Sequence, residues 1–454
     1  MTTTAKLSRL VAVAVAMVVG GCSFDISNPN TPDIIGENPT RSEVASTATG
    51  IIVATRADVA DWALDGAILG REAYRLDGSD PGFTNELMQG PLDPGSNPFG
   101  GDHWAEEYAA IRTANDLLAV IGTASLLTAE EQSATVGFAH TLQAYNFLII
   151  LDAHSQDSIP IDVGTSVTDA PAPFRTNAEG YDHVIALLDG AVSELDAGGA
   201  AFPFPLPPGF AGFDTPATFR QFNRALRARV AVYRGDFAGA LVALNESFIN
   251  SDPTASLSLG VYMDFGAGAG DFPNPLAISP TTGENFGHPS LRTGAQRQPL
   301  PSDTLDQRFV DKLVIRDPRS LGTPQLLTSD LGWIRYPNPN ASIPLIKNEE
   351  LILLRAEANI GQNNLGPALA DIDLIRTTSG KLAAYAGPVD QASLLTELLY
   401  NKRYSLMFEG GHSWIDFRRY GRTADLTAFD RPGPPPDQIF PTLPIPTPEV
   451  LPRQ

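Results

Sequence analysis

The chain has 454 residues, of which 43% are hydrophobic and 18% are charged, which allows a sizeable core and argues against global disorder. Its formal net charge of −21 makes nucleic acid a poor partner, because an acidic surface repels phosphate backbones. Glycine (40 residues) and proline (38 residues) are both frequent, which predicts long ordered loops between the elements.

Residues 1–21 have the pattern of a bacterial lipoprotein signal peptide. Lys6 and Arg9 precede an apolar run, LVAVAVAMVV, that is too short to span a bilayer, and small residues then lead to Cys22, the only cysteine. We therefore predict Cys22 as the lipidation site; the alternative is an ordinary secretory signal with a chance cysteine. Cleavage before Cys22 would remove Lys6 and Arg9 and leave a net charge of −23. Acyl chains would anchor the protein without a transmembrane helix.

Residues 22–40, which begin with the cysteine, are polar and rich in proline, so we predict a lipidated tether. Apolar residues at helical spacing follow along much of the chain. Residues 104–121 and 130–151 predict a long helical pair, and residues 179–196 predict a further helix.

Two later segments predict helical hairpins. In the first, a Gly-Asp turn separates two apolar stripes that each follow the helical period. The first stripe is Phe219, Phe222, Leu226, Val230 and Tyr233, and the second is Phe237, Ala240, Leu241, Leu244 and Phe248. The second hairpin spans residues 349–376, with a turn from Gly361 to Gly366. The predicted fold class is therefore mainly all-α, a scaffold of tetratricopeptide-like helical pairs.

The region at about 250–346 lacks a clear period, because glycine, proline and aromatic residues interrupt it. We predict a loop-rich insertion with short irregular elements, within a single helical domain over residues 41–454. Binding residues often lie on such loops. An exposed ring can stack on the C–H face of a sugar, which makes Trp333, Tyr336 and Tyr262 the candidate ligand-binding residues. The alternative for Trp333 is that it packs its loop onto the scaffold.

Catalytic and metal-binding motifs are absent from the sequence: it has no His-Glu-x-x-His, zinc-type Cys/His spacing, Walker A motif or Gly-x-Ser-x-Gly elbow. We therefore expect no enzymatic activity, no metal site and no cofactor. Asp152 and Asp157 could act as an acid–base pair, or hold a cation together with His154. Ordinary loop polarity is the simpler explanation for all three residues.

The stretch YSLMFEGGHSWIDFRRYGR at 404–422 combines apolar, glycine and charged residues. We expect it to end a scaffold helix at Gly410-Gly411, with Trp414 docked on the core. Leu406, Met407 and Phe408 should pack inward. The charged members, Glu409, Asp416, Arg418 and Arg419, should satisfy one another or nearby backbone groups.

Seven segments in chain order resemble the SusD/RagB family of outer-membrane lipoproteins. They are Cys22 with NPN at 28–30, WAEEYAAIRTAN at 104–115, HTLQAYNFLIILDAHSQDSIPI, FNRALRARVAVYRGDFAGAL, EELILLRAEANIGQNNLGPALADIDLIRTTSG, LLTELLYNKRYSLMFEGGHSWIDFRRYGR and LPIPTPEV at 443–450. The resemblance implies a surface-exposed, lipid-anchored protein that captures a glycan or other nutrient beside a TonB-dependent transporter and breaks no bond. The chain departs from the family pattern, for example at Ser413, where an arginine is usual. The family's ligand is therefore not carried over.

Two other functions remain open on the sequence alone. A tetratricopeptide-type, lipid-anchored scaffold would bind a protein or peptide partner instead of a sugar. A lipid-anchored glycan hydrolase would need a deep cleft with two carboxylates about 5–10 Å apart.

Overall fold

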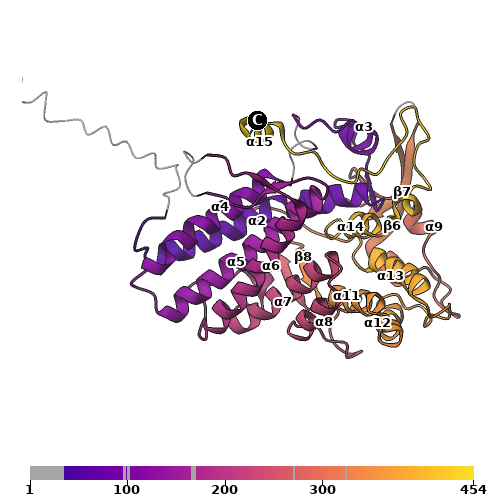
Figure 1. Ribbon diagram of the computed structural model, residues 1–454. Coiled ribbons are helices and arrows are strands. Elements are labelled where there is room, and N and C mark those ends of the chain that lie inside the picture. The colour runs from indigo at the N-terminus through magenta and orange to yellow at the C-terminus, as the bar shows by residue number, and fades with distance from the viewer. Residues whose placement is uncertain are drawn as a thin grey trace, which may run out of the picture. The chain divides into compact units, whose positions relative to one another are not determined.

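The computed structural model describes residues 35–453, except 96–98, 100–102, 165–169, 269–270 and 323–324. Residues 37–454 form one compact unit (Figure 1). Cys22, the signal peptide, the NPN motif and most of the tether lie outside the described residues. The predicted domain boundaries therefore stay predictions.

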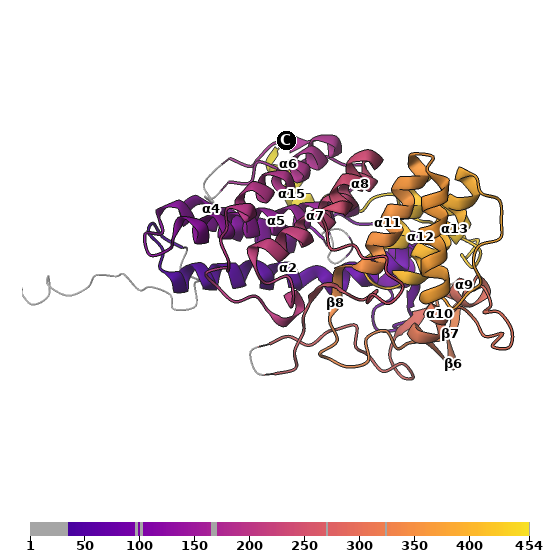
Figure 2. The same cartoon turned by 90° about the horizontal axis from the view of Figure 1, so that it is seen from below.

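Helices dominate the described part of the chain, and each of the long N-terminal helices packs against its neighbours in sequence (Figure 1). These helices are α2 (Arg41–Leu69), α3 (Gly82–Gln89), α4 (Ala105–Val120), α5 (Ala129–Ala153), α6 (Asn177–Asp196), α7 (Pro216–Tyr233) and α8 (Phe237–Asn245). The later helices are α9 (Ser290–Thr293), α10 (Gln307–Lys312), α11 (Asn348–Gly361), α12 (Leu365–Thr378), α13 (Gln391–Ser405), α14 (His412–Arg419) and α15 (Thr447–Val450). Both predicted hairpins are present, as α7–α8 and α11–α12. Figure 2 shows α11, α12 and α13 side by side.

The starts of three long helices are set by the same local chemistry. In each, a threonine side chain accepts a hydrogen bond from the backbone N–H of a glutamate three residues on, whose carboxylate reaches back to the threonine N–H. The pairs are Thr40 with Glu43 at α2, Thr128 with Glu131 at α5, and Thr176 with Glu179 at α6. Such a cap stabilises a helix by about 1 kcal/mol.

α5 lies in the core. It is the one helix in the described ranges that is long and apolar enough, by composition, to cross a membrane, yet 89% of its most apolar 18-residue window is buried. Its apolar character therefore reflects packing against α4, α6 and α7.

The predicted insertion contains more regular structure than its sequence indicates. A four-stranded antiparallel sheet has the order β1-β5-β7-β6, and β4 pairs with β8. The strands are β1 (Ala73–Arg75), β4 (Gly260–Met263), β5 (Asn285–Gly287), β6 (Leu313–Leu321), β7 (Leu327–Trp333) and β8 (Ile343–Lys347). Pro318, Gly332 and a register shift after Ile315 interrupt the strand alternation that sequence analysis would detect.

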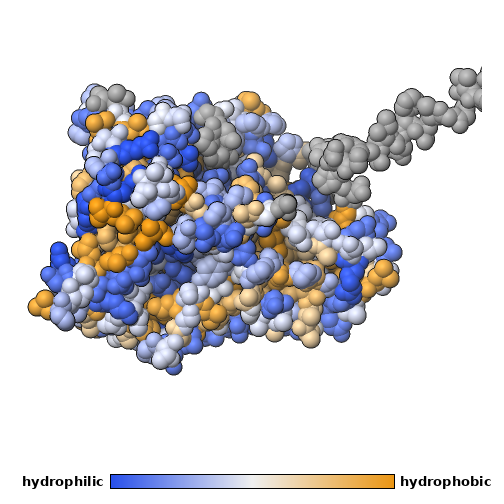
Figure 3. Space-filling view, turned by 180° about the vertical axis from the view of Figure 1, so that it is seen from behind, coloured by the Kyte–Doolittle hydropathy of each residue, from blue (hydrophilic) through white to orange (hydrophobic). Residues whose placement is uncertain are grey.

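The β6–β7 hairpin carries apolar side chains in contact with solvent. Ile315 and Leu326 are 57% and 63% exposed. Figure 3 shows apolar residues in several patches across one face of the molecule. An exposed apolar patch of this kind is typical of a surface that contacts another molecule.

The turn between α13 and α14 joins the insertion to the helical scaffold. As predicted, Leu406, Met407 and Phe408 are buried. Gly411 has a φ of +70°, which favours glycine. A Cβ atom on Gly66 of α2 would lie 2.4 Å from the Gly411 Cα atom. Glycine at position 66 therefore lets α2 touch the backbone of the turn.

Glu409 in this turn is buried among three cations, which together we name the Glu409 cluster. Its carboxylate lies 3.2 Å from Lys312 Nζ, 2.9 Å from Arg335 Nε and 2.7 Å from Lys347 Nζ. Burial alone would raise the pKa of Glu409, but the three cations hold it well below its ordinary value. The expectation that the charged members satisfy one another or nearby backbone groups holds for Asp416, Arg418 and Arg419, but Glu409 takes its partners from outside the stretch. Arg419 joins Asp416, Glu357 and Lys402 in a second buried group.

Glu409→Gln should lower the free energy of unfolding by roughly 3–5 kcal/mol, because it removes the buried carboxylate that the three cations share, although Lys347 keeps Glu349 as a second partner at 3.2 Å. Urea denaturation measures this loss. The matched control is Asp303→Asn, which removes a carboxylate paired with Arg297 where both side chains are more than 60% exposed. The control should change stability by less than about 0.5 kcal/mol. Equal losses in the two variants would contradict a structural role for the cluster.

Glu72 gives stability a pH dependence. Its Oε2 atom accepts a hydrogen bond from Phe408 N (2.9 Å), and burial raises its pKa to about 8 although that bond opposes the rise. The folded state thus keeps a proton that the unfolded state releases, so stability falls as pH rises from about 5 to 8.

Glu72→Gln should make this fall shallower, by on the order of 1–3 kcal/mol across that range, because the amide does not titrate. Chemical denaturation at pH 5, 6, 7 and 8 measures the slope. Glu106→Gln, which changes an exposed carboxyl on α4, should leave the slope as in the wild type. A Glu72→Gln slope equal to that of the wild type would show that another group is responsible.

Candidate functional site

Two of the aromatic residues nominated from sequence lie in the core. Trp333 and Tyr336 are each 3% exposed. The Trp333 ring stacks on Phe408 with centroids 4.4 Å apart, and Tyr336 donates a hydrogen bond to the Phe408 carbonyl (2.8 Å). Neither ring offers a face to solvent, which favours the packing role left open for Trp333. Tyr262 on β4 is half-buried and donates to the Ser258 carbonyl. Ligand binding by these residues stays a prediction.

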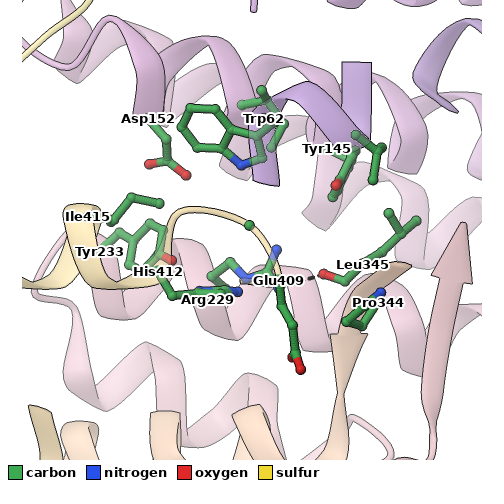
Figure 4. A pocket seen from close by; sticks show the side chains of 13 residues that line it. Trp62, Tyr145, Asp152, Arg229, Tyr233, Pro344, Leu345, Glu409, His412 and Ile415 are labelled. Carbon is green, nitrogen blue, oxygen red and sulfur yellow. Dashed lines mark hydrogen bonds between the residues drawn. The ribbon is translucent and has the colours of Figure 1, made fainter. Parts of the chain in front are cut away.

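A small polar cavity lies between α2, α5, α7 and the turn before α14 (Figure 4). Its volume is about 20 Å³. A water molecule needs roughly 10–15 Å³, so the cavity fits an ordered water and excludes a sugar. Burial raises the pKa of Asp152 in its wall to about 7 and lowers the pKa of His412 to about 4. These shifts belong to a buried polar network of the scaffold.

A proline-rich segment, residues 438–446, runs across the surface as an extended strap. Pro441, Pro444 and Pro446 lack backbone donors and cannot continue a helix. Backbone hydrogen bonds fasten the strap and the residue after it to three other segments: Gln438 N to Met88 O (2.8 Å), Leu443 N to Ala153 O (2.9 Å) and Thr447 N to Pro94 O (2.8 Å).

Two side chains of α14 also hold the strap. Trp414 Nε1 donates to the Phe440 carbonyl (2.8 Å), and Arg418 Nη1 donates to the Pro441 carbonyl (2.8 Å). Trp414 is fully buried, as expected from the sequence. Hydrogen bonds thus fix the strap to the scaffold at several points along its length, and its backbone has a defined position.

An open groove of about 650 Å³ lies along the strap. Ligand pockets in proteins usually have volumes of roughly 300–1,000 Å³. The groove is lined by Pro91, Leu92, Pro94, Asp157, Gln438, Phe440, Thr442, Pro444, Ile445 and Val450. Apolar walls with a few polar groups are typical of a ligand-binding site.

Phe440 supplies the aromatic surface of the groove. Its ring is half-buried and lies against Gly90, where an added Cβ atom would come within 2.8 Å of Phe440 Cζ. Gly90 also has a φ of +72°, so glycine is favoured there on two grounds. The ring thus lies against backbone at Gly90, and part of its surface remains exposed in the groove lining.

The polar groups of the groove suit hydroxyl ligands. Asp157 Oδ2 accepts a hydrogen bond from Thr442 Oγ1 (3.1 Å), and Gln438 Nε2 donates to the Gln89 carbonyl (2.8 Å). Burial raises the pKa of Asp157 above its ordinary value, an effect that the Thr442 hydrogen bond opposes. Asp157 Oδ1 and Gln438 Oε1 can then accept hydrogen bonds from a ligand.

Asp152, His154 and Asp157 do not form a common site. Asp152 accepts from Tyr181 Oη (3.2 Å), and His154 Nδ1 donates to the Leu443 carbonyl (2.9 Å). The described residues contain no group of three or more histidine, cysteine or acidic side chains that could hold a metal ion. Of the three residues, Asp157 alone lines the groove.

Neither Phe440 nor the strap was predicted from the sequence as a binding site. The groove combines a loop after α3, a turn after α5 and the strap, and these segments are separated by up to about 350 residues. The available signal was a single aromatic residue in a proline-rich stretch without a period, DQIFPTLPIPTPEV. Such a stretch predicts a surface loop, and its aromatic residue is a candidate contact.

No protein-family model matches the sequence, and no curated protein matches it. Solved structures do match the fold. A SusD-like carbohydrate-binding protein from Bacteroides fragilis has a TM-score of 0.69 at 14% identity, and the match covers 90% of this chain and 98% of that one. A SusD superfamily protein from Bacteroides vulgatus has a TM-score of 0.66 at 14% identity, covering 91% and 97%. A laminarin-binding SusD-like protein has a TM-score of 0.63 at 16% identity, covering 92% and 98%.

The chain has a SusD-like fold. This finding confirms the fold expected from the resemblance, which rested on short segments spread along the sequence. It also confirms the mainly helical class with tetratricopeptide-like pairs. At 14–16% sequence identity, these matches show a shared fold and nothing about the ligand. The ligand has to be inferred from this chain's own groove.

Proposed function

We propose that this protein binds a glycan in the groove beside the strap and delivers it to a TonB-dependent transporter of the outer membrane. The groove carries the proposal, because its volume, its half-buried Phe440 ring and its acceptor groups suit a sugar chain. The solved structures that share the fold add support, since two of them are described as carbohydrate-binding and laminarin-binding proteins.

In this mechanism the protein captures its ligand without breaking a bond. The apolar C–H face of a sugar would stack on Phe440, while its hydroxyl groups would donate to Asp157 and Gln438. Hydrolysis of a glycosidic bond usually requires a pair of carboxylates on either side of the bond. Asp157 is the one carboxylate among the described residues that line the groove, which favours binding over hydrolysis.

A second candidate function is a lipid-anchored scaffold for a protein partner. The apolar side chains exposed on the β6–β7 hairpin favour it, among them Ile315 and Leu326. The two functions differ in what the groove does: a scaffold of this kind would not need Phe440 for its binding.

Phe440→Ala should weaken glycan binding by roughly 3- to 10-fold, because stacking on an aromatic ring contributes on the order of 0.5–1.5 kcal/mol beyond its buried area. Isothermal titration with laminarin oligosaccharides, followed by a wider set of glycans, measures the change. Phe429→Ala is the control: this ring is 40% exposed in the preceding segment and does not line the groove. Equal glycan affinities in the two variants would show that the glycan binds outside the groove.

The membrane and transporter parts of the proposal depend on Cys22. Cys22→Ser should shift the protein from the membrane fraction to the soluble fraction, because the hydroxyl is not acylated, whereas Ser23→Ala should stay with the membrane. Pull-down of the tagged wild type from gently solubilised outer membranes should recover a TonB-dependent barrel in near-equal amount, identified by mass spectrometry. Its absence from complexes that survive solubilisation would contradict the delivery role.

A further inference from the structure

The groove is acidic, and this property bears on the class of glycan that it takes. Among the described residues that line it, Asp157 is the one ionisable residue. Asp93 lies between the lining residues Leu92 and Pro94, and Glu449 is next to Val450. The whole chain also has a net charge of −21, so the electrostatic potential is negative both at the groove and over the protein as a whole.

The arginines on or beside the C-terminal segment are committed to other partners. Arg418 donates to the carbonyls of Pro441 and Asp152 and lies over the Trp414 ring, and Arg431 is buried against Asp437. Arg453 lies 2.9 Å from Glu449 and 2.7 Å from the Ala172 carbonyl.

The described lining residues include no lysine or arginine, and these three arginines are held by backbone carbonyls and carboxylates of the protein itself. A carboxylate or sulfate on a glycan is normally bound by such a cation, often through two parallel hydrogen bonds to one arginine. Within its described lining, the groove has no group that would compensate the charge of an anionic sugar.

Uncharged sugars, in contrast, suit the acceptors that are present. A hydroxyl group that donates to the Asp157 carboxylate makes a charge-assisted hydrogen bond, which is about twice as strong as a neutral one. Asp157 is partly buried, so its charge is less screened there than at a fully exposed position. The same charge that strengthens a bond to a hydroxyl group repels a carboxylate in its place.

We infer that the groove selects uncharged glycans over glycans that carry carboxylate or sulfate groups. The inference rests on the proposed function, since it names the class of ligand for the same groove. It assigns Asp157 a role in specificity: the residue acts as an acceptor for hydroxyl groups and as a barrier to anions.

Calorimetric titrations test this inference. The full-length protein in detergent is titrated with a neutral laminarin oligosaccharide and, separately, with a size-matched oligomer of galacturonic acid. The wild type should bind the neutral oligomer at least about 10-fold more tightly. Asp157→Asn should reduce that ratio about 5-fold, because one partly exposed like charge contributes about this much. Asp214→Asn, at an exposed position two residues before α7 and outside the groove lining, makes the same charge change and should leave the ratio as it is.

A salt series on the wild type gives a second measurement that does not depend on how the variants fold. Binding of the galacturonic acid oligomer should strengthen as the sodium chloride concentration is raised, and binding of the neutral oligomer should stay constant.

The selectivity would be overturned, with glycan binding left in place, if the acidic oligomer bound as tightly as the neutral one and Phe440→Ala abolished that binding. Failure of the protein to bind any glycan would overturn both. A ratio unchanged in Asp157→Asn, or an acidic affinity that does not respond to salt, would also overturn the inference.

Discussion

The buried carboxylate of Glu409 holds three distant parts of the chain in one place. Lys312 ends α10, Arg335 follows β7, and Lys347 ends β8, so each cation comes from a different segment of the insertion. Taking four charges out of water is costly, and the cost is offset only when every charge keeps its partners. The position of the turn before α14 is therefore tied to the position of the sheet.

The groove depends on this turn through a sequence of contacts. The turn sets where α14 begins, and α14 places Trp414 and Arg418 against the carbonyl groups of the strap. The strap then presents Phe440 and Thr442 opposite Asp157. A ligand site built this way is pre-organised, which reduces the entropy lost on binding. The arrangement also explains why a conspicuous motif, YSLMFEGGHSWIDFRRYGR, serves architecture while the groove lies beside it.

Local signals made much of the helical scaffold predictable. The stripe from Phe219 to Tyr233 and the capping pair Thr128–Glu131 act within a few residues, so they can be read without the fold. The burial of Trp333 could not be read this way, because Phe408, which covers its ring, lies 75 positions further along the chain. The groove was hidden for the same reason, since its walls come from three segments that meet only in the folded protein. The β6–β7 strands were obscured by a proline, a glycine and a register shift.

A crystal structure of the protein with a bound neutral laminarin oligosaccharide tests the central claim most directly. The account predicts sugar density in the groove, with one ring against Phe440 and a hydroxyl group within hydrogen-bonding distance of Asp157. Sugar bound at another surface, such as the β6–β7 hairpin, with the groove empty, would contradict it.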